Sequence, residues 1–95
     1  DGRSAVDAMF QVSRVSGVVV GMGDDECQLK FVSNTADVKV GDLVLSSGLG
    51  GIFPKGLIIG KVSKVFKKKQ GLFQEITLIP GSDLSRLEEV LVLLP

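Results

Sequence analysis

Apolar residues in this chain gather into seven short runs separated by turn-forming segments. The runs are rich in Val, Ile, Leu and Phe, which favour strands, and the segments between them carry Gly, Asn, Asp and Ser. Short strands at regular spacing predict a β-sandwich or a small barrel. The expected strands cover residues 5–10, 17–20, 28–32, 43–45, 57–66, 73–79 and 89–94.

The expected sixth strand shows how one face of the sheet is buried. Gln74, Ile76 and Leu78 would share one face of this strand. Glu75 and Thr77 would share the opposite face with Ile79. This pattern is typical of a curved antiparallel sheet with a single face on the core.

One short helical signal precedes the last run. Ser82 or Asp83 can cap a single turn over residues 82–88, which is too short to stand alone. We expect this turn to carry the chain across one end of the fold, so that the last strand can pair and remove an open edge. The sequence therefore predicts an all-β fold, a small six- or seven-stranded antiparallel barrel with one short helical turn near the C-terminus.

Length and charge narrow the picture further. The 95 residues make one domain over 1–95, with a single small core. Eleven basic and eleven acidic residues balance, so no net charge draws the chain to nucleic acid or an anionic membrane. No apolar run approaches the roughly 18 to 20 residues that span a bilayer, so we expect no membrane span. Cys27 is the only cysteine, which excludes an internal disulfide framework.

The absence of histidine bears on catalysis. Histidine is the usual general base near neutral pH and the commonest metal ligand, so a Ser-His-Asp triad and most zinc sites cannot be built from this chain. Ser46 and Ser47 stand beside Gly48 without a candidate base, and we interpret them as strand-end residues. We expect no enzyme, and no catalytic residue, cofactor site or metal site.

The segment 41–60 is the most informative part of the chain, because it holds six of the twelve glycines between two apolar runs. A flexible linker would lack large apolar residues, whereas this one contains Leu49, Ile52 and Phe53, and Pro54 stiffens its exit. We expect these apolar side chains to be buried as a plug, with a positive φ at one or more of the glycines at 48, 50 and 51. The structural signature loop comprises Gly48, Leu49, Gly50, Gly51, Ile52, Phe53, Pro54 and Gly56.

Two phosphate-binding motifs fail in this loop. The dinucleotide fingerprint would need glycine where Phe53 stands, followed by a helix. Residues 51–56 have the glycine spacing of a P-loop, but Leu57 stands where lysine is required. A tight, packed loop is the favoured interpretation.

Two charged clusters are interpreted as surface turns. The acids at 24–26 lack the spacing of a calcium loop and indicate a solvated turn. Lys64 and the lysines at 67–69 could touch phosphate or an acidic partner, but a charged hairpin tip that protects a strand edge is favoured. The chain has no Trp or Tyr, and its five Phe fall mainly in apolar runs, which argues against binding of single-stranded nucleic acid.

Four segments carry a resemblance to a known family. Residues 38–57, which include the signature loop, are followed by 71–74 and 83–93 in matching order and spacing, and the opening 1–8 matches as well. Together they resemble the bacterial rod shape-determining protein MreC, at the second of its two extracytoplasmic β-domains.

The resemblance implies that this domain is a fragment of a larger membrane-anchored protein, placed at the periplasmic or extracytoplasmic face of the bacterial cytoplasmic membrane. It also implies a fold similar to one barrel of chymotrypsin-like proteases, without protease activity. The implied function is that of a non-catalytic scaffold of the cell-elongation machinery for peptidoglycan synthesis. The implied partners are the protein itself, MreD and the elongation-specific penicillin-binding transpeptidase.

Two alternatives remain open from the residues alone. A small-barrel module that binds a glycan or an oligonucleotide would need an exposed aromatic or a sustained basic groove. A hydrolase half-domain would need a neighbouring domain to supply the base.

Overall fold

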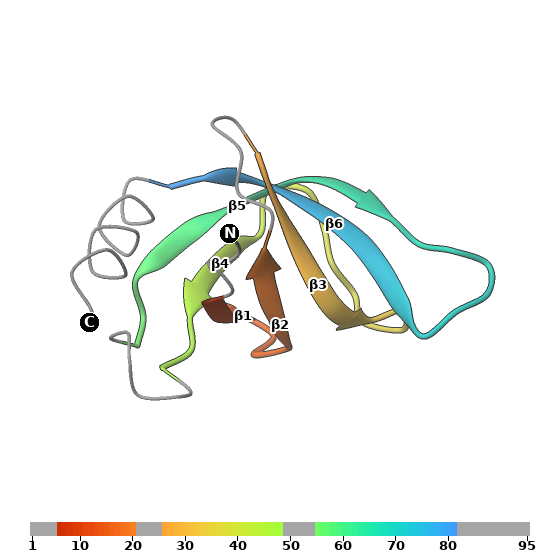
Figure 1. The fold of residues 1–95 in the computed structure, drawn as a ribbon, viewed down its shortest axis with the longest axis horizontal. Helices are drawn as coiled ribbons and strands as arrows, with labels where there is room; N and C mark the ends of the chain where they lie inside the picture. The colour runs from red at the N-terminus through yellow and green to blue at the C-terminus, as the bar shows by residue number, and fades with distance from the viewer. Residues whose placement is uncertain (1–5, 21–25, 49–54, 82–95) are drawn as a thin grey trace.

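A computed structural model describes residues 6–20, 26–48 and 55–81, which form six antiparallel strands (Figure 1). Each expected strand in these ranges is confirmed, with ends that differ by one residue at most. The expected strand at 89–94 and the helical turn at 82–88 lie outside the described residues. The strands are β1 (Val6–Phe10), β2 (Ser16–Val20), β3 (Cys27–Ser33), β4 (Leu43–Ser46), β5 (Ile58–Phe66) and β6 (Phe73–Pro80).

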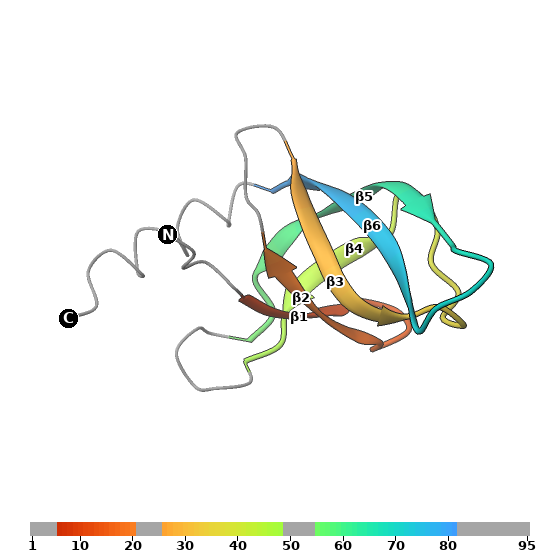
Figure 2. The same cartoon turned by 45° about the vertical axis from the view of Figure 1, so that its right-hand side comes forward.

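The six strands form a closed barrel in the order β1-β2-β3-β6-β5-β4. β4 returns to pair with β1 through Ala8 opposite Ser46 and Phe10 opposite Val44. This pairing closes the barrel, so no strand beyond residue 81 is needed for closure. Figure 2 shows β3 and β6 crossing in front of β4, with one interior between them.

The core fills this interior with alternate side chains from all six strands. The half-buried pattern expected for β6 is confirmed, and its core face is the one that carries Gln74, Ile76 and Leu78, which are all buried. Cys27 is buried in β3 as a small strand residue. The buried apolar residues are Val6, Ala8, Phe10, Val19, Cys27, Leu29, Val32, Val38, Val44, Ile59, Val62, Ile76 and Leu78.

Gly60 lies where two strands approach closely. It pairs with Val44 on β4 and with Pro80 on β6, so backbone passes on both sides of it. A Cβ built on Gly60 would lie 2.5 Å from the carbonyl oxygen of Ile79, a separation that no real side chain adopts. Only glycine therefore fits where β5 meets β6 at this point.

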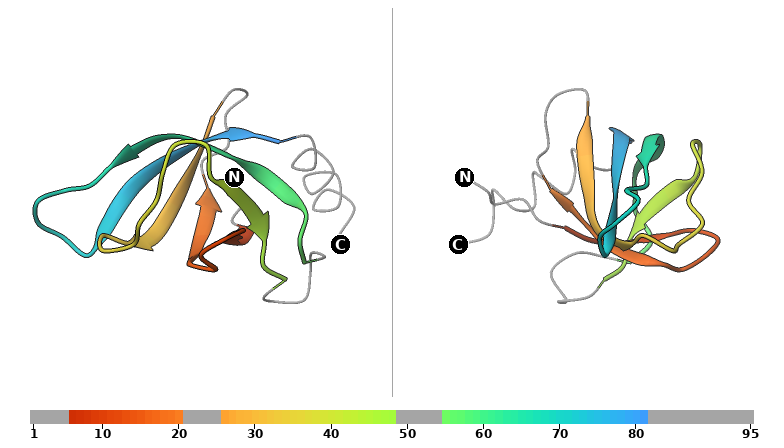
Figure 3. Two further views of the ribbon diagram at one scale, coloured as in Figure 1. Left: turned by 180° about the vertical axis from the view of Figure 1, so that it is seen from behind. Right: turned by 90° about the vertical axis from the view of Figure 1, so that its right-hand side faces the viewer.

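The connection between β5 and β6 lies at one end of the molecule, beside the loop that follows β3 (Figures 1 and 3). Asn34 holds the two together, because its backbone N–H donates to the carbonyl of Leu72 at 2.8 Å and its Nδ2 donates to the carbonyl of Lys68 at 2.9 Å. Gly71 has a φ of +122° in this turn. The lysine-rich connection is thus tied to the barrel wall.

Candidate functional site

The signature loop connects β4 to β5. β4 ends at Ser46, before the loop, and β5 begins at Ile58, after it. Ser46 is fully buried and joins both sides of the loop. Its N–H donates to the carbonyl of Leu57 at 2.8 Å, its Oγ accepts from the Leu57 N–H at 2.9 Å, and its carbonyl accepts from the Gly56 N–H at 2.8 Å. The base of the loop is therefore closed by three hydrogen bonds to one residue.

The prediction that Ser46 lies at the end of a strand is confirmed. The sequence analysis did not predict that Ser46 closes the base of the loop with hydrogen bonds. The available signal was a small hydroxyl residue at the end of an apolar strand, directly before the glycines of the loop. Such a residue can satisfy backbone groups that a tight loop leaves unpaired. Ser47 continues the attachment, since its N–H donates to the carbonyl of Asp7 at 3.0 Å.

Both described glycines of the signature loop have the left-handed backbone that the sequence predicts for this region. Gly48 has a φ of +78°, which confirms that expectation, and Gly56 has a φ of +90°. A Cβ on Gly48 would lie 3.0 Å from the Cβ of Lys55, so the two sides of the loop are in contact at its base. Residues 49–54 lie outside the described residues, and the burial of Leu49, Ile52 and Phe53 as a plug stays a prediction.

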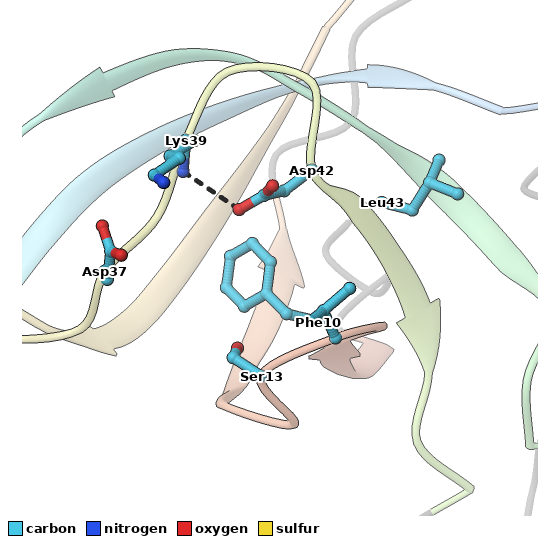
Figure 4. A pocket seen from close by; sticks show the side chains of 7 residues that line it. Phe10, Ser13, Asp37, Lys39, Asp42 and Leu43 are labelled. Atoms are coloured by element: carbon cyan, nitrogen blue, oxygen red, sulfur yellow. Dashed lines mark hydrogen bonds between the residues drawn. The ribbon is translucent and has the colours of Figure 1, made fainter.

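A surface hollow of about 270 Å³ lies near the β1–β2 turn and the loop before β4 (Figure 4). Its polar groups mainly hold turns: Asp42 Oδ2 accepts from the Lys39 N–H at 3.0 Å, and Ser13 Oγ accepts from the Val15 N–H at 3.3 Å. No pairing of nucleophile and base is built among these groups. Its lining residues are Phe10, Val12, Ser13, Asp37, Lys39, Asp42 and Leu43.

Within residues 6–20, 26–48 and 55–81, no cluster of three or more His, Cys, Asp or Glu side chains could hold a metal ion. No helix in the same ranges is long and apolar enough to cross a membrane. The thiol of Cys27 lies in the core and contacts the carbonyl oxygen of Leu78 at 4.0 Å.

The described residues of the two charged clusters lie at the surface, as the sequence predicts. Glu26 is exposed and pairs with Lys64 at 3.8 Å, whereas Asp24 and Asp25 lie outside the described residues. Lys68 pairs with Glu75 at 3.1 Å, and the lysines at 67–69 are all exposed in the β5–β6 connection.

The five phenylalanines fall mainly in apolar runs, as the sequence shows, but three of them lie outside the core. Phe31, Phe66 and Phe73 are exposed by 59%, 61% and 42%. They lie in strands, but their side chains occupy the outer face of the sheet, which composition alone does not reveal. The argument used against single-strand binding therefore does not hold for these three residues.

Comparison with known proteins identifies the family. A family model described as "Rod shape-determining protein MreC, barrel core" matches residues 1–94. The chain belongs to the MreC family. The resemblance seen in the sequence is thereby confirmed.

Relatives of this family are similar along most of the chain. The cell shape-determining protein MreC of Listeria monocytogenes is 39% identical over 96 residues, which cover 98% of this chain and 32% of that protein. The MreC of Escherichia coli is 36% identical over 87 residues, or 88% of this chain and 24% of that protein. The chain spans less than a third of the length of the relatives that it matches in sequence.

Solved MreC structures share the barrel. The crystal structure of MreC from Pseudomonas aeruginosa superimposes with a TM-score of 0.77 at 30% identity, covering 80% of this chain and 50% of that one. A complex between a penicillin-binding protein, PBP2, and MreC from Helicobacter pylori matches with a TM-score of 0.70 at 30% identity, covering 88% of this chain and 55% of that one. These likenesses agree with the closed six-stranded barrel.

Proposed function

We propose that this chain is a non-catalytic scaffold module of the bacterial cell-elongation machinery, maintaining rod shape through protein contacts during peptidoglycan synthesis. The observation that carries the proposal is the Helicobacter pylori complex, in which a protein with this barrel is bound to PBP2. The family description as rod shape-determining supports the same role.

The barrel has physical properties suited to a scaffold. Its described strands are paired on both sides, so its outer side chains are held in fixed relative positions. A rigid surface loses little conformational entropy when a partner binds, which favours specific contacts. The function therefore depends on side chains at the surface.

The proposal includes the setting of the module. The domain over 1–95 belongs to a longer membrane-anchored protein and works at the extracytoplasmic face of the cytoplasmic membrane. Its partners are the elongation-specific penicillin-binding transpeptidase, MreD and further copies of itself. The greater length of the relatives supports the first point, and the PBP2 complex of the Helicobacter pylori relative supports the transpeptidase.

Cell shape tests this function directly. In the source bacterium, the segment that encodes residues 1–95 is deleted from the chromosomal gene, and cell width is measured by microscopy. We expect rods to widen and become round, and a plasmid copy of the intact gene to restore them. Unchanged rods, with the shortened protein present at its normal level, would contradict the proposed function.

A further inference from the structure

A bulge in β3 brings an aromatic side chain to the surface. Leu29 lies opposite Ile76 and Val32 lies opposite Gln74, so two residues of β3, Lys30 and Phe31, lie opposite the single residue Glu75 of β6. Such a bulge places an extra residue in one strand and redirects its side chains. Both β3 residues of the bulge, Lys30 and Phe31, are exposed.

The backbone of Phe31 adopts a conformation that bulky residues avoid. Its φ is +65°, in the left-handed region where glycine and asparagine are the usual residues. The ring is 59% exposed, so burial in the core does not explain the aromatic residue at this position. A bulky residue that is held in a strained backbone conformation and yet stays largely exposed points to a function at the surface.

Phe31 belongs to a larger apolar surface. Its ring meets that of Phe73 edge to face, with centroids 5.5 Å apart and planes at 83°. Phe66 of β5 pairs with Glu75 of β6, on the side of Glu75 away from β3. Neighbouring strands are about 5 Å apart, so Phe31 and Phe66 flank Glu75 at short range. We call this surface the aromatic patch, and it comprises Phe31, Phe66, Leu72 and Phe73.

The aromatic patch is held in place by hydrogen bonds beneath it. The buried amide of Gln74 donates through Nε2 to the carbonyls of Ser33 at 2.7 Å and Ala36 at 3.0 Å. The bonds from Asn34 to Lys68 and Leu72 fix the adjacent turn. The patch is therefore preorganised, which lowers the entropy that a partner must overcome on binding.

Lysines surround the aromatic patch. Five of them lie on β3, on the last three residues of β5 (64–66) and in the adjoining turn, against two glutamates that pair with Lys64 and Lys68. No described carboxylate forms an ion pair with the other three, so this face has an excess of positive charge. The five are Lys30, Lys64, Lys67, Lys68 and Lys69.

We propose that the aromatic patch binds a partner protein whose surface carries apolar side chains edged by carboxylates. This inference rests on the proposed function and names the surface through which it operates. Rings fixed on strands suit a shaped protein surface, and the lysines complement the carboxylates around its rim. A protein is favoured over a lipid surface or a nucleic acid because the MreC relative from Helicobacter pylori is found in a complex with a protein, PBP2.

The test compares two substitutions to asparagine in the full-length protein. Phe31→Asn removes a ring, while asparagine tolerates the left-handed backbone at this position. Val12→Asn is the matched control, because Val12 is 91% exposed and lies in the β1–β2 turn outside the patch. Circular dichroism melting checks that both variants keep the fold.

The probe is the full-length elongation-specific transpeptidase of the same bacterium, with affinity measured by biolayer interferometry. We expect Phe31→Asn to weaken binding by at least about tenfold and Val12→Asn by less than about twofold. Raising the salt concentration should slow association of the unchanged protein, since the lysines steer encounter. Parallel titrations use single-stranded DNA and phosphatidylglycerol vesicles.

The outcomes separate the inference from the proposed function. Equal affinities of Phe31→Asn and the unchanged protein would overturn the aromatic patch and leave transpeptidase binding in place. If the unchanged protein does not bind the transpeptidase, both the inference and the proposed function are contradicted. Tighter binding to DNA or vesicles than to the transpeptidase, lost in Phe31→Asn, would also overturn the inference, because the patch would then serve another class of partner.

Discussion

At the scale of single residues, the barrel depends on glycines at two kinds of position. At one kind a Cβ atom would clash with a neighbouring strand, and at the other the backbone φ is positive. Gly60 illustrates the first case and Gly48 the second. Neither residue contributes a side chain to the core. Both glycines stabilise the barrel because they have no Cβ atom.

We expect Gly60→Ala to lower the free energy of unfolding by about 3 kcal/mol, since overpacking forces the backbone of β6 to move. The cause is the 2.5 Å separation between the added Cβ and the oxygen of Ile79. Urea unfolding followed by far-ultraviolet circular dichroism measures this, because the chain has no Trp or Tyr for fluorescence. Lys61→Ala, an exposed neighbour in β5, serves as the control and should change stability by less than about 0.5 kcal/mol. Equal stabilities of the two variants would contradict the packing argument.

Replacement of Gly48 by valine should also destabilise the chain, by roughly 2 kcal/mol, because a β-branched residue is strained at a positive φ. Contact with the Cβ of Lys55 at 3.0 Å adds to the effect. Gly48→Asn should lose less, since asparagine tolerates this backbone region. Thermal melting of both variants gives the comparison, and identical melting temperatures would refute the claim that the loop requires its φ of +78°.

At the scale of elements, the end of β3 and the start of β6 are joined by the amide of Gln74. We expect Gln74→Met to destabilise by about 2 kcal/mol, because two backbone carbonyls would each lose a partly buried hydrogen bond. Those carbonyls belong to Ser33 and Ala36. The measurement is urea unfolding, with Gln70→Met as a control at an exposed position in the β5–β6 connection. Stability equal to that of the unchanged chain would show that this hydrogen-bonded junction contributes little.

The elements differ in how far the sequence predicts them. Strand positions could be predicted because apolar runs are short and bounded by turn residues. The bulge in β3 could not be predicted. It depends on which residues of β6 pair with β3, and the hydrophobic pattern along the sequence does not give that register. The exposure of Phe31 was missed for the same reason. The hydrogen bonds of Ser46 were missed because they join residues eleven positions apart across the loop.

At the scale of the whole molecule, closure of the barrel changes the argument for self-association. Association through strand edges would need an unpaired edge, and the described strands leave none in the closed barrel. Any contact between copies must then use side chains on outer faces. The zero net charge still permits close approach, since copies do not repel one another strongly.

We predict weak self-association of the isolated 95-residue chain, with a dissociation constant on the order of 1 mM, because a single module lacks the avidity of multiple attachment points. Analytical ultracentrifugation across a wide concentration range measures it. The chain should sediment as a monomer when dilute and show rising average mass when concentrated. A constant monomer mass at every concentration would exclude self-association through this domain.

The central claim is that this barrel contacts the transpeptidase of the elongation machinery through the aromatic patch, and crosslinking in living cells tests it most directly. Photoreactive p-benzoylphenylalanine replaces Phe31 in the full-length protein, with the same replacement at Val12 as control. After irradiation, an antibody against the transpeptidase detects crosslinked product. The account predicts a transpeptidase adduct from position 31 and none from position 12. The absence of an adduct from position 31, in cells that remain rod-shaped, would contradict it.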